Sequence, residues 1–274
     1  MIDFLQRNAM RTILLGMLLA FGTPIMQRFA DLPSWVGLFE TAGIVLVLVG
    51  LAMAFLFSGK DSDADPITVH SPVGGRWLAM NSPASKVPSH GVRAYGQAFA
   101  IDLLHEPEDG VRPQFGTGSG MSDPKEYPAF GEPVLAMVDG VVVKAADRQR
   151  DHRTRTHWWS VAVMMLEGVF RELRGAGGVV GNHVVIDRGD GVFALVAHLK
   201  KGSATVKVGD RVRAGDVIGA CGNSGNTSEP HVHAQLMDRA RPSAAKGLPM
   251  AFADVRLGGE TRDGLPENTA YVVA

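Results

Sequence analysis

Two histidines separated by a single residue are the strongest sign of chemistry in this sequence. His231 and His233 lie in the segment SEPHVHAQL, Ser228–Leu236. Residues i and i+2 of a β-strand point to the same face, so an extended segment would hold both imidazoles side by side. Two surface histidines would explain this spacing without any function. The glycine-rich turn at Gly222–Asn226 and the other candidate ligands favour a metal ligand beside a catalytic imidazole.

Three further residues could complete a metal site with this pair. Asp102 lies within the apolar run Phe99–Leu103, where a carboxylate needs a partner because burying an unpaired charge is costly. A metal ion is one such partner and an arginine is the other. His198 follows an apolar run, and His90 lies in the loop-like segment PSHG. Alone, His198 fits a half-buried histidine with a hydrogen-bond partner, so only the whole set indicates chemistry.

These residues lie in motifs that resemble the lysostaphin-like, LytM-type zinc metallopeptidases, which cut peptide bonds in bacterial peptidoglycan. The resemblance runs from about Ser89 to Leu236 and does not cover the first 66 residues. Each motif is weak alone, but their order along the chain is specific. In that order they are FAID ending at Asp102, GEPVLAMVDGVV (Gly131–Val142), GNHVVID (Gly181–Asp187), AHL with His198, VKVGDRVRAGDVIG (Val206–Gly219) and GNSGNTSEPHVH (Gly222–His233).

The resemblance implies a metal site and two catalytic histidines. Asp102 and His233 would bind Zn2+, while His198 and His231 would flank a water molecule beside the metal. Three protein ligands would leave a fourth tetrahedral position open, as in catalytic zinc sites. His231 is then the expected general base, and His198 would orient the water or stabilise the oxyanion, with the two roles exchangeable.

The third ligand departs from the family's usual HxxxD spacing, because Ala98 stands four residues before Asp102. His90 is the nearest upstream histidine, and its segment resembles the part of the family with a longer interval, so we assign His90 as the third ligand. His105 is the alternative. It follows Asp102 by three residues and would point to the opposite face of a continued strand. Glu229, where the family often has glycine, changes the groove edge without removing a ligand.

Residues 67–274 predict an all-β core of antiparallel sheets, as expected for a LytM-type zinc metallopeptidase domain. Turn residues recur, and β-branched and apolar residues alternate with polar ones. Asp-Gly and Gly-Asp pairs between such runs are typical of tight hairpins. The segments with this pattern are Pro133–Ala146, Asn182–Leu199 and Val206–Gly222.

One segment breaks the β pattern, within a helical insertion at about residues 150–178. Trp158–Leu173 is rich in helix formers. A helix of this length would be about 24 Å long, too short to span a membrane comfortably. We expect it to pack on the β core, with contact to a bilayer surface or a wall over a substrate groove as alternatives.

Residues 1–57 are expected to form a membrane anchor. Val36–Phe57 would make a helix about 33 Å long, enough to cross a hydrocarbon core of about 30 Å. The apolar run 12–26 is shorter and contains two glycines and Pro24, which fits a short span, a re-entrant segment or an interfacial helix. The polar stretch 58–66 predicts a linker to the globular part.

The charges around the main span bear on its orientation. Arg7, Arg11 and Arg28 precede it, and three aspartates follow it beside Lys60. If only residues 36–57 cross, the positive-inside rule places the N-terminus in the cytoplasm and the peptidase domain on the extracytoplasmic side. Two crossings would require an external N-terminus for the same placement. A peptidoglycan substrate also demands an extracytoplasmic domain, so we expect localisation at the cytoplasmic membrane.

Composition narrows the remaining function classes. A net charge of −1 without a long basic block argues against a nucleic-acid partner, and the single Cys221 excludes an intrachain disulfide. The main rival is a catalytically inactive LytM-type module that binds or regulates cell-wall hydrolases. Val206–Gly219 also resembles hairpins of biotinyl and lipoyl carrier domains, but the chain has no modifiable Met-Lys-Met turn.

Overall fold

The computed structural model describes residues 2–56 and 64–274, and the chain divides into two compact units. Unit 1 is Met1–Lys60 and unit 2 is Asp61–Ala274. The expected linker at 58–66 lies mostly outside the described residues, as does Phe57 at the end of the expected main span.

Unit 1 consists of two long helices, α1 (Ile2–Phe29) and α2 (Gly37–Leu56), with the short 3-10 helix η1 (Ser34–Val36) between them. The apolar run expected at 12–26 is part of the much longer α1. Pro24 lies inside that helix and does not end it.

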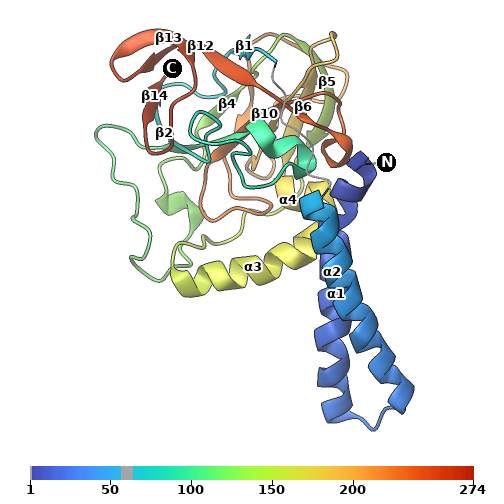
Figure 1. The fold of residues 1–274 in the computed structure, drawn as a ribbon. Coiled ribbons are helices and arrows are strands. Elements are labelled where there is room, and N and C mark those ends of the chain that lie inside the picture. The colour runs from blue at the N-terminus through green and yellow to red at the C-terminus, as the bar shows by residue number, and fades with distance from the viewer. Residues whose placement is uncertain (1, 57–63) are drawn as a thin grey trace. The chain divides into compact units, whose positions relative to one another are not determined.

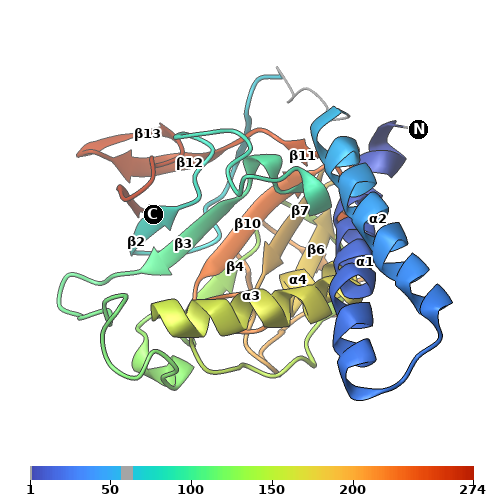
Figure 2. The same cartoon turned by 60° about the horizontal axis from the view of Figure 1, so that its bottom comes forward.

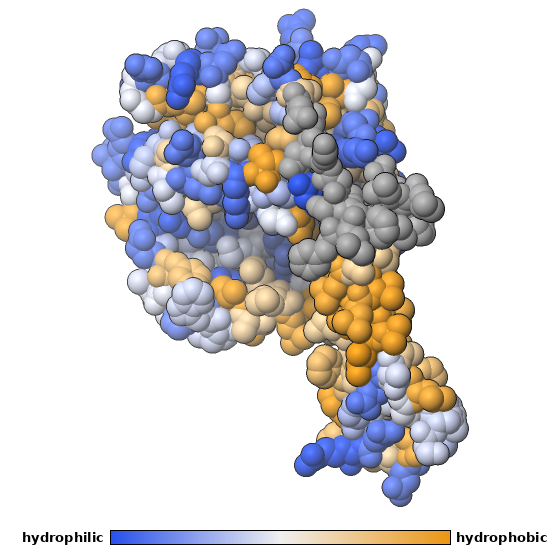
Figure 3. Space-filling view, in the orientation of Figure 1, coloured by the Kyte–Doolittle hydropathy of each residue, from blue (hydrophilic) through white to orange (hydrophobic). Residues whose placement is uncertain are grey.

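Both helices of unit 1 are candidate membrane spans by length and composition. The stretches that qualify are Thr12–Phe29 and Ser34–Met53. Figure 3 shows hydrophobic colour over the middle of this helical pair and hydrophilic colour near its loop. The two helices approach closely at glycines, since a Cβ on Gly16 would stand 2.6 Å from the carbonyl oxygen of Gly43. Small residues at such contacts are typical of helix pairs in membranes.

Unit 2 is a β structure with a few short helical segments (Figure 1). Its strands are β1 (Ile67–Val69), β2 (Arg76–Met80), β3 (Ile101–His105), β4 (Pro133–Leu135), β5 (Gly140–Ala146), β6 (His183–Asp187), β7 (Phe193–Ala197), β8 (Arg211–Val212), β9 (Val217–Ala220), β10 (Val232–Met237), β11 (Gly247–Leu248), β12 (Met250–Leu257), β13 (Glu260–Gly264) and β14 (Tyr271–Val273). Its helices are η2 (Ala94–Phe99), η3 (Pro124–Glu126), α3 (Trp158–Leu173), α4 (Ala176–Val180) and η4 (Pro242–Ala244).

One large sheet holds most of these strands. Among the described residues its main path runs β1-β12-β14-β2-β3-β10-β7-β6-β5-β8, and β4 pairs with β9 in a separate sheet. Neighbouring strands are antiparallel except for the parallel pair β1–β12. The expected all-β core of antiparallel sheets is therefore confirmed, as is the inserted helix α3, which lies outside the sheet in both ribbon views (Figures 1 and 2).

The strand pairing differs from the expected hairpins in two of the three segments. Only Asn182–Leu199 forms a local hairpin, in which β6 pairs with β7 across the Asp-Gly turn. The strands within Pro133–Ala146 and Val206–Gly222 pair between the two segments instead, as β4 with β9 and β5 with β8. The reason lies in the connection from β4 to β5, because Ala136 and Met137 are fully buried and cannot form an exposed two-residue turn.

Side chains of the central strands alternate between two faces of the sheet, because successive residues of a strand point to opposite sides. On β10, Val232, Ala234 and Leu236 face the main hydrophobic core. The alternate residues His233 and Gln235 therefore lie on the other face and are also buried. The neighbouring strands β3 and β7 flank β10 on either side, as Figure 2 shows.

Candidate metal centre

The pairing of β3 with β10 brings Asp102 and His233 together. They are directly opposite in the antiparallel register, although 131 positions apart in the chain. Cross-strand neighbours on one face have side chains within contact distance. Nδ1 of His233 accordingly donates a hydrogen bond of 2.9 Å to Oδ1 of Asp102.

His90 reaches the same carboxylate from the loop before β3. Its Nε2 lies 3.0 Å from Oδ2 of Asp102, and its ring lies edge-on to that of His233 with centroids 5.0 Å apart. The chain then returns to β3 through η2, where Tyr95 and Gly96 have positive φ values of 60° and 75°. This turn accommodates the long interval between His90 and Asp102.

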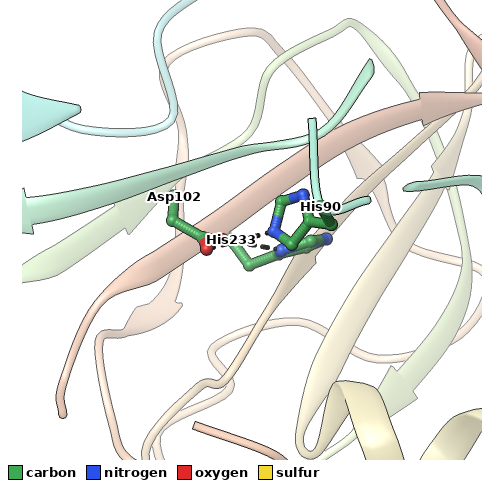
Figure 4. A group of neighbouring side chains, drawn as sticks. All are labelled: His90, Asp102 and His233. Carbon is green, nitrogen blue, oxygen red and sulfur yellow. Dashed lines mark hydrogen bonds and ion pairs between the residues drawn. The ribbon is translucent and has the colours of Figure 1, made fainter. Parts of the chain in front are cut away.

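The three predicted ligands therefore form one cluster (Figure 4). One ligand atom from each of His90, Asp102 and His233 lies within 4.8 Å of the others. Asp102 and His233 are buried and His90 is partly buried. Two imidazoles and a carboxylate form the N/N/O donor set that zinc accepts in open tetrahedral sites.

The alternative ligand His105 lies elsewhere. Its ring stacks on Trp77 with centroids 4.7 Å apart, and Nδ1 lies 3.2 Å from the carbonyl oxygen of Pro128. It occupies the opposite face of β3 from Asp102, as the strand period requires.

Each cluster residue has a partner on its outer side. Nε2 of His233 donates to Oε1 of Gln235 at 2.8 Å, which leaves Nδ1 directed at the cluster. Nδ1 of His90 lies 3.0 Å from the Ser89 hydroxyl, which leaves Nε2 directed inward. Asn81 donates a hydrogen bond of 2.8 Å to Oδ2 of Asp102. Such outer partners fix ring orientation at metal sites, so the surroundings fit a bound divalent ion.

The two predicted catalytic histidines lie beside this cluster. The rings of His198 and His231 have centroids 4.7 Å apart, and His198 is 5.7 Å from His233 by the same measure. His198 follows the end of β7 with a φ of 61°, in the left-handed region that only a few per cent of non-glycine residues occupy.

Backbone carbonyls set the orientation of both rings. Nδ1 of His198 donates to the carbonyl oxygen of Ser224 at 2.8 Å. Nδ1 of His231 donates to the carbonyl oxygen of Glu229 at 2.8 Å. In each ring Nε2 is therefore the nitrogen left for other partners, and that of His231 lies 3.6 Å from Oδ1 of Asp102.

Burial and charge set the protonation states in the cluster. Burial acts to raise the pKa of Asp102, but the neighbouring imidazoles of His90 and His231 and the hydrogen bond from His233 outweigh it and hold that pKa well below its usual value. Burial acts to lower the pKa of His233, yet its bond to Asp102 raises that pKa overall. Burial lowers the pKa of His198 well below its usual value, so this ring is neutral near pH 7.

Sequence reasoning missed several residues of this site, among them Asn81, Gln235 and Tyr95. Gln235 alone carried a usable signal, because it follows His233 by two positions and shares its strand face. It also donates to the carbonyl oxygen of Tyr95 at 2.8 Å, which fixes its amide orientation. Asn81 and Tyr95 approach through loop conformations that no local pattern predicts.

A largely buried ion pair lies next to His231. Nη1 of Arg112 is 2.9 Å from both carboxylate oxygens of Glu229, whose carbonyl holds His231. Burial raises the pKa of Glu229, and Arg112 opposes this rise. The pair ties the loop around Arg112 to the segment that carries His231.

Comparison with known families agrees with this geometry over part of the chain. Residues 126–245 match Peptidase family M23. His198, His231 and His233 lie inside the matched segment, whereas His90 and Asp102 precede it. The pairing of β3 with β10 brings Asp102 to the same place, and the loop before β3 brings His90 there.

The segment that aligns with this chain is only a part of each individual relative. Peptidoglycan DD-endopeptidase ShyA of Vibrio cholerae is 32% identical over 150 residues, covering 54% of this chain and 26% of the relative. Glycyl-glycine endopeptidase ALE-1 of Staphylococcus capitis is 35% identical over 92 residues, covering 33% of this chain and 25% of the relative. The chain thus spans about a quarter of the length of these relatives. The solved catalytic domain of lysostaphin from Staphylococcus simulans has 20% identity and a TM-score of 0.32, covering 65% of this chain and 84% of that one.

Proposed function

We propose that this chain, which carries a domain of peptidase family M23, is a membrane-anchored, zinc-dependent endopeptidase that hydrolyses peptide bonds in bacterial peptidoglycan. The observation that carries the proposal is the cluster of His90, Asp102 and His233 with His198 and His231 beside it. An inactive binding module would have no need of five groups arranged in this way.

His90, Asp102 and His233 would hold the metal, and the chemistry supplied by zinc there is Lewis acidity, which lowers the pKa of water to about 7 and polarises the scissile carbonyl. Their outer bonds to Ser89, Asn81 and Gln235 keep the inward atoms in place.

The two remaining histidines move and position protons in this proposal. Nε2 of His231 takes a proton from the attacking water as the oxygen bonds to the carbonyl carbon, and returns it to the amine as the C–N bond breaks. Nε2 of His198 carries no proton while this neutral ring donates through Nδ1 to Ser224, so in this proposal it accepts a hydrogen bond from the attacking water and orients it. We assign the base to His231 because its Nε2 lies 3.6 Å from a ligand carboxylate.

The substrate class rests on the relatives. ShyA is named a peptidoglycan DD-endopeptidase and ALE-1 a glycyl-glycine endopeptidase. Both names describe endopeptidases, and the name of ShyA supports peptidoglycan peptide as the substrate class. We propose that the peptidase domain lies on the extracytoplasmic side, where this substrate is found, with α1 and α2 as its membrane anchor.

The test is release of soluble fragments from purified peptidoglycan by the full chain in detergent. We expect release that stops with a zinc chelator and returns when zinc is added back. Full-length chain that binds peptidoglycan but releases nothing at any zinc concentration would instead support the inactive module.

A further inference from the structure

We propose that α3 is an interfacial helix whose outward face lies on the surface of a lipid bilayer. The proposal rests on the membrane attachment proposed above. Six large side chains form the apolar stripe of α3, and all of them are exposed: Trp158, Trp159, Met165, Leu166, Phe170 and Leu173. They follow one another at helical spacing along a single face. The exposed fraction reaches 75% for Trp158 and 70% for Met165.

The opposite face of α3 holds the polar contacts to the domain. Glu167 bonds to the buried Arg155 at 2.8 Å and to Arg171 at 3.1 Å. Ser160 is fully buried. Gly168 faces Asn226, where an added Cβ would stand 3.5 Å from the amide oxygen. A surface helix normally buries its apolar face against the protein. In α3 the polar face contacts the domain and the apolar stripe is exposed, so the stripe is available to another partner.

A neighbouring loop extends the apolar stripe at its N-terminal end. The Phe115 ring lies edge-on to Trp158 with centroids 5.0 Å apart. Phe115 is 45% exposed, and Val111 in the same loop is 89% exposed. Figure 3 shows patches of tan and orange, with pale areas between them, along the edge of the domain where Figure 1 draws α3. Two tryptophans at one end of such a patch suit the boundary between headgroups and acyl chains.

Charge around α3 fits an anionic lipid surface. Both carboxylates of the helix take inward partners, Glu167 with its two arginines and Glu172 with the Tyr95 hydroxyl. Exposed arginines border the helix instead, with Arg150 and Arg153 before it and Arg174 after it. An apolar face bordered by basic residues is the usual pattern of helices that lie in a membrane interface.

Chain length favours a bilayer over other occupants. Ten residues separate the end of α2 at Leu56 from the start of β1 at Ile67. Fully extended, they reach at most about 35 Å. Ile67 is thus held within about that distance of the lipid in which α1 and α2 are proposed to lie, which keeps a bilayer surface at high local concentration beside the domain.

Docking on lipid would also fix the orientation of the metal centre. Glu172 on α3 accepts from Tyr95, whose carbonyl holds Gln235 beside His233. Arg171 donates to Asn226 at 3.1 Å, in the turn before His231. The helix therefore contacts loops on both sides of the site. The angle between α3 and the bilayer would then determine the angle at which the metal centre lies to the bilayer.

The test places an environment-sensitive fluorophore on the apolar stripe of the full chain. Leu166→Cys is labelled in a Cys221→Ala background, and the matched control is Val208→Cys, which lies near β8 and is similarly exposed at 60% against 64%. The chain is reconstituted as one copy per nanodisc of phosphatidylethanolamine and phosphatidylglycerol with brominated acyl chains. We expect several-fold stronger quenching at 166 than at 208.

Equal quenching at the two positions in discs that retain the chain would overturn the docking and leave the anchor intact. Quenching at 166 that is lost in single-copy discs, but seen with two copies, would also overturn it and assign the stripe to a second chain. Replacing Leu166 and Phe170 by glutamate should restore water exposure of a label at Met165→Cys. Peptidoglycan release by the same preparations reports the proposed hydrolysis separately, so either proposal can fail alone.

Discussion

Gln235 accepts a hydrogen bond of 2.8 Å from Nε2 of His233 and so determines which nitrogen of that ring faces Asp102. Because Gln235 is itself held by the carbonyl of Tyr95, the orientation is set before any ligand arrives. Gln235→Leu removes the acceptor while keeping the volume. We expect about a 10- to 100-fold loss of zinc affinity, measured by competition with a fluorescent chelator.

Gln235→Glu is the matched control, because a carboxylate can still accept from Nε2 of His233. Its zinc affinity should lie closer to wild type than that of the leucine variant. Wild-type affinity in Gln235→Leu would show that this hydrogen bond does not position the ligand.

Removing His231 should separate metal binding from hydrolysis. His231→Ala keeps the three proposed ligands, so we expect bound zinc to stay near one per chain. Hydrolysis should fall by about 10²- to 10⁴-fold, because the proposed base is gone. Elemental analysis and peptidoglycan release on the same samples check both parts, and a variant that loses its zinc would contradict the assigned role.

The ion pairs of Glu167 predict how pH affects stability. Burial acts to raise the pKa of Glu167, but Arg155 and Arg171 lower it overall. A lowered folded-state pKa gives stability above the unfolded value, which disappears as pH falls through the folded value. Glu167→Gln should therefore be less stable than wild type at pH 7, by about 1 kcal/mol or less for a partly exposed pair.

That difference should shrink between pH 7 and an acidic pH below the folded-state pKa of Glu167, where the carboxyl of wild type is protonated as well. Urea unfolding of the full chain in detergent, followed by tryptophan fluorescence, gives both values. A gap that is the same at both pH values would mean that the glutamate charge contributes nothing.

Much of the architecture follows from local patterns. The alternation of apolar and polar residues predicted the β core, and the run Trp158–Leu173 predicted the bounds of α3. Both features depend only on residues that are close together in the sequence. Local hairpins were expected within Pro133–Ala146 and within Val206–Gly222, whereas the strands of the two segments pair with each other, since buried connections rather than turn residues decide the pairing. Likewise, α1 begins far before residue 12, because its helix continues through polar residues such as Arg7 and Arg11.

The sequence was enough to predict the residue types of the site. It was not enough to predict which residues contact one another. The spacing of His231 and His233 was visible in the sequence, but only strand register sets Asp102 opposite His233. Asn81 donates to Asp102 from a residue with a φ of 48°, and a single asparagine in a loop carries no sign of this.

Two candidate spans predict the topology of the anchor. If α1 and α2 both cross, the N-terminus and unit 2 lie on the same side, whereas a single crossing would separate them. We expect protease added to intact spheroplasts to remove an N-terminal tag and to cut unit 2. Protection of the tag alone would favour one crossing.

The central claim is that His90, Asp102 and His233 bind one metal ion, and the zinc content of two histidine variants tests it most directly. His90→Ala removes a proposed ligand, while His105→Ala removes a histidine that stacks on Trp77 on the other face of β3. Elemental analysis of purified chains should give one zinc for wild type and His105→Ala, and far less for His90→Ala. Full zinc in His90→Ala, or loss in His105→Ala alone, would contradict the account.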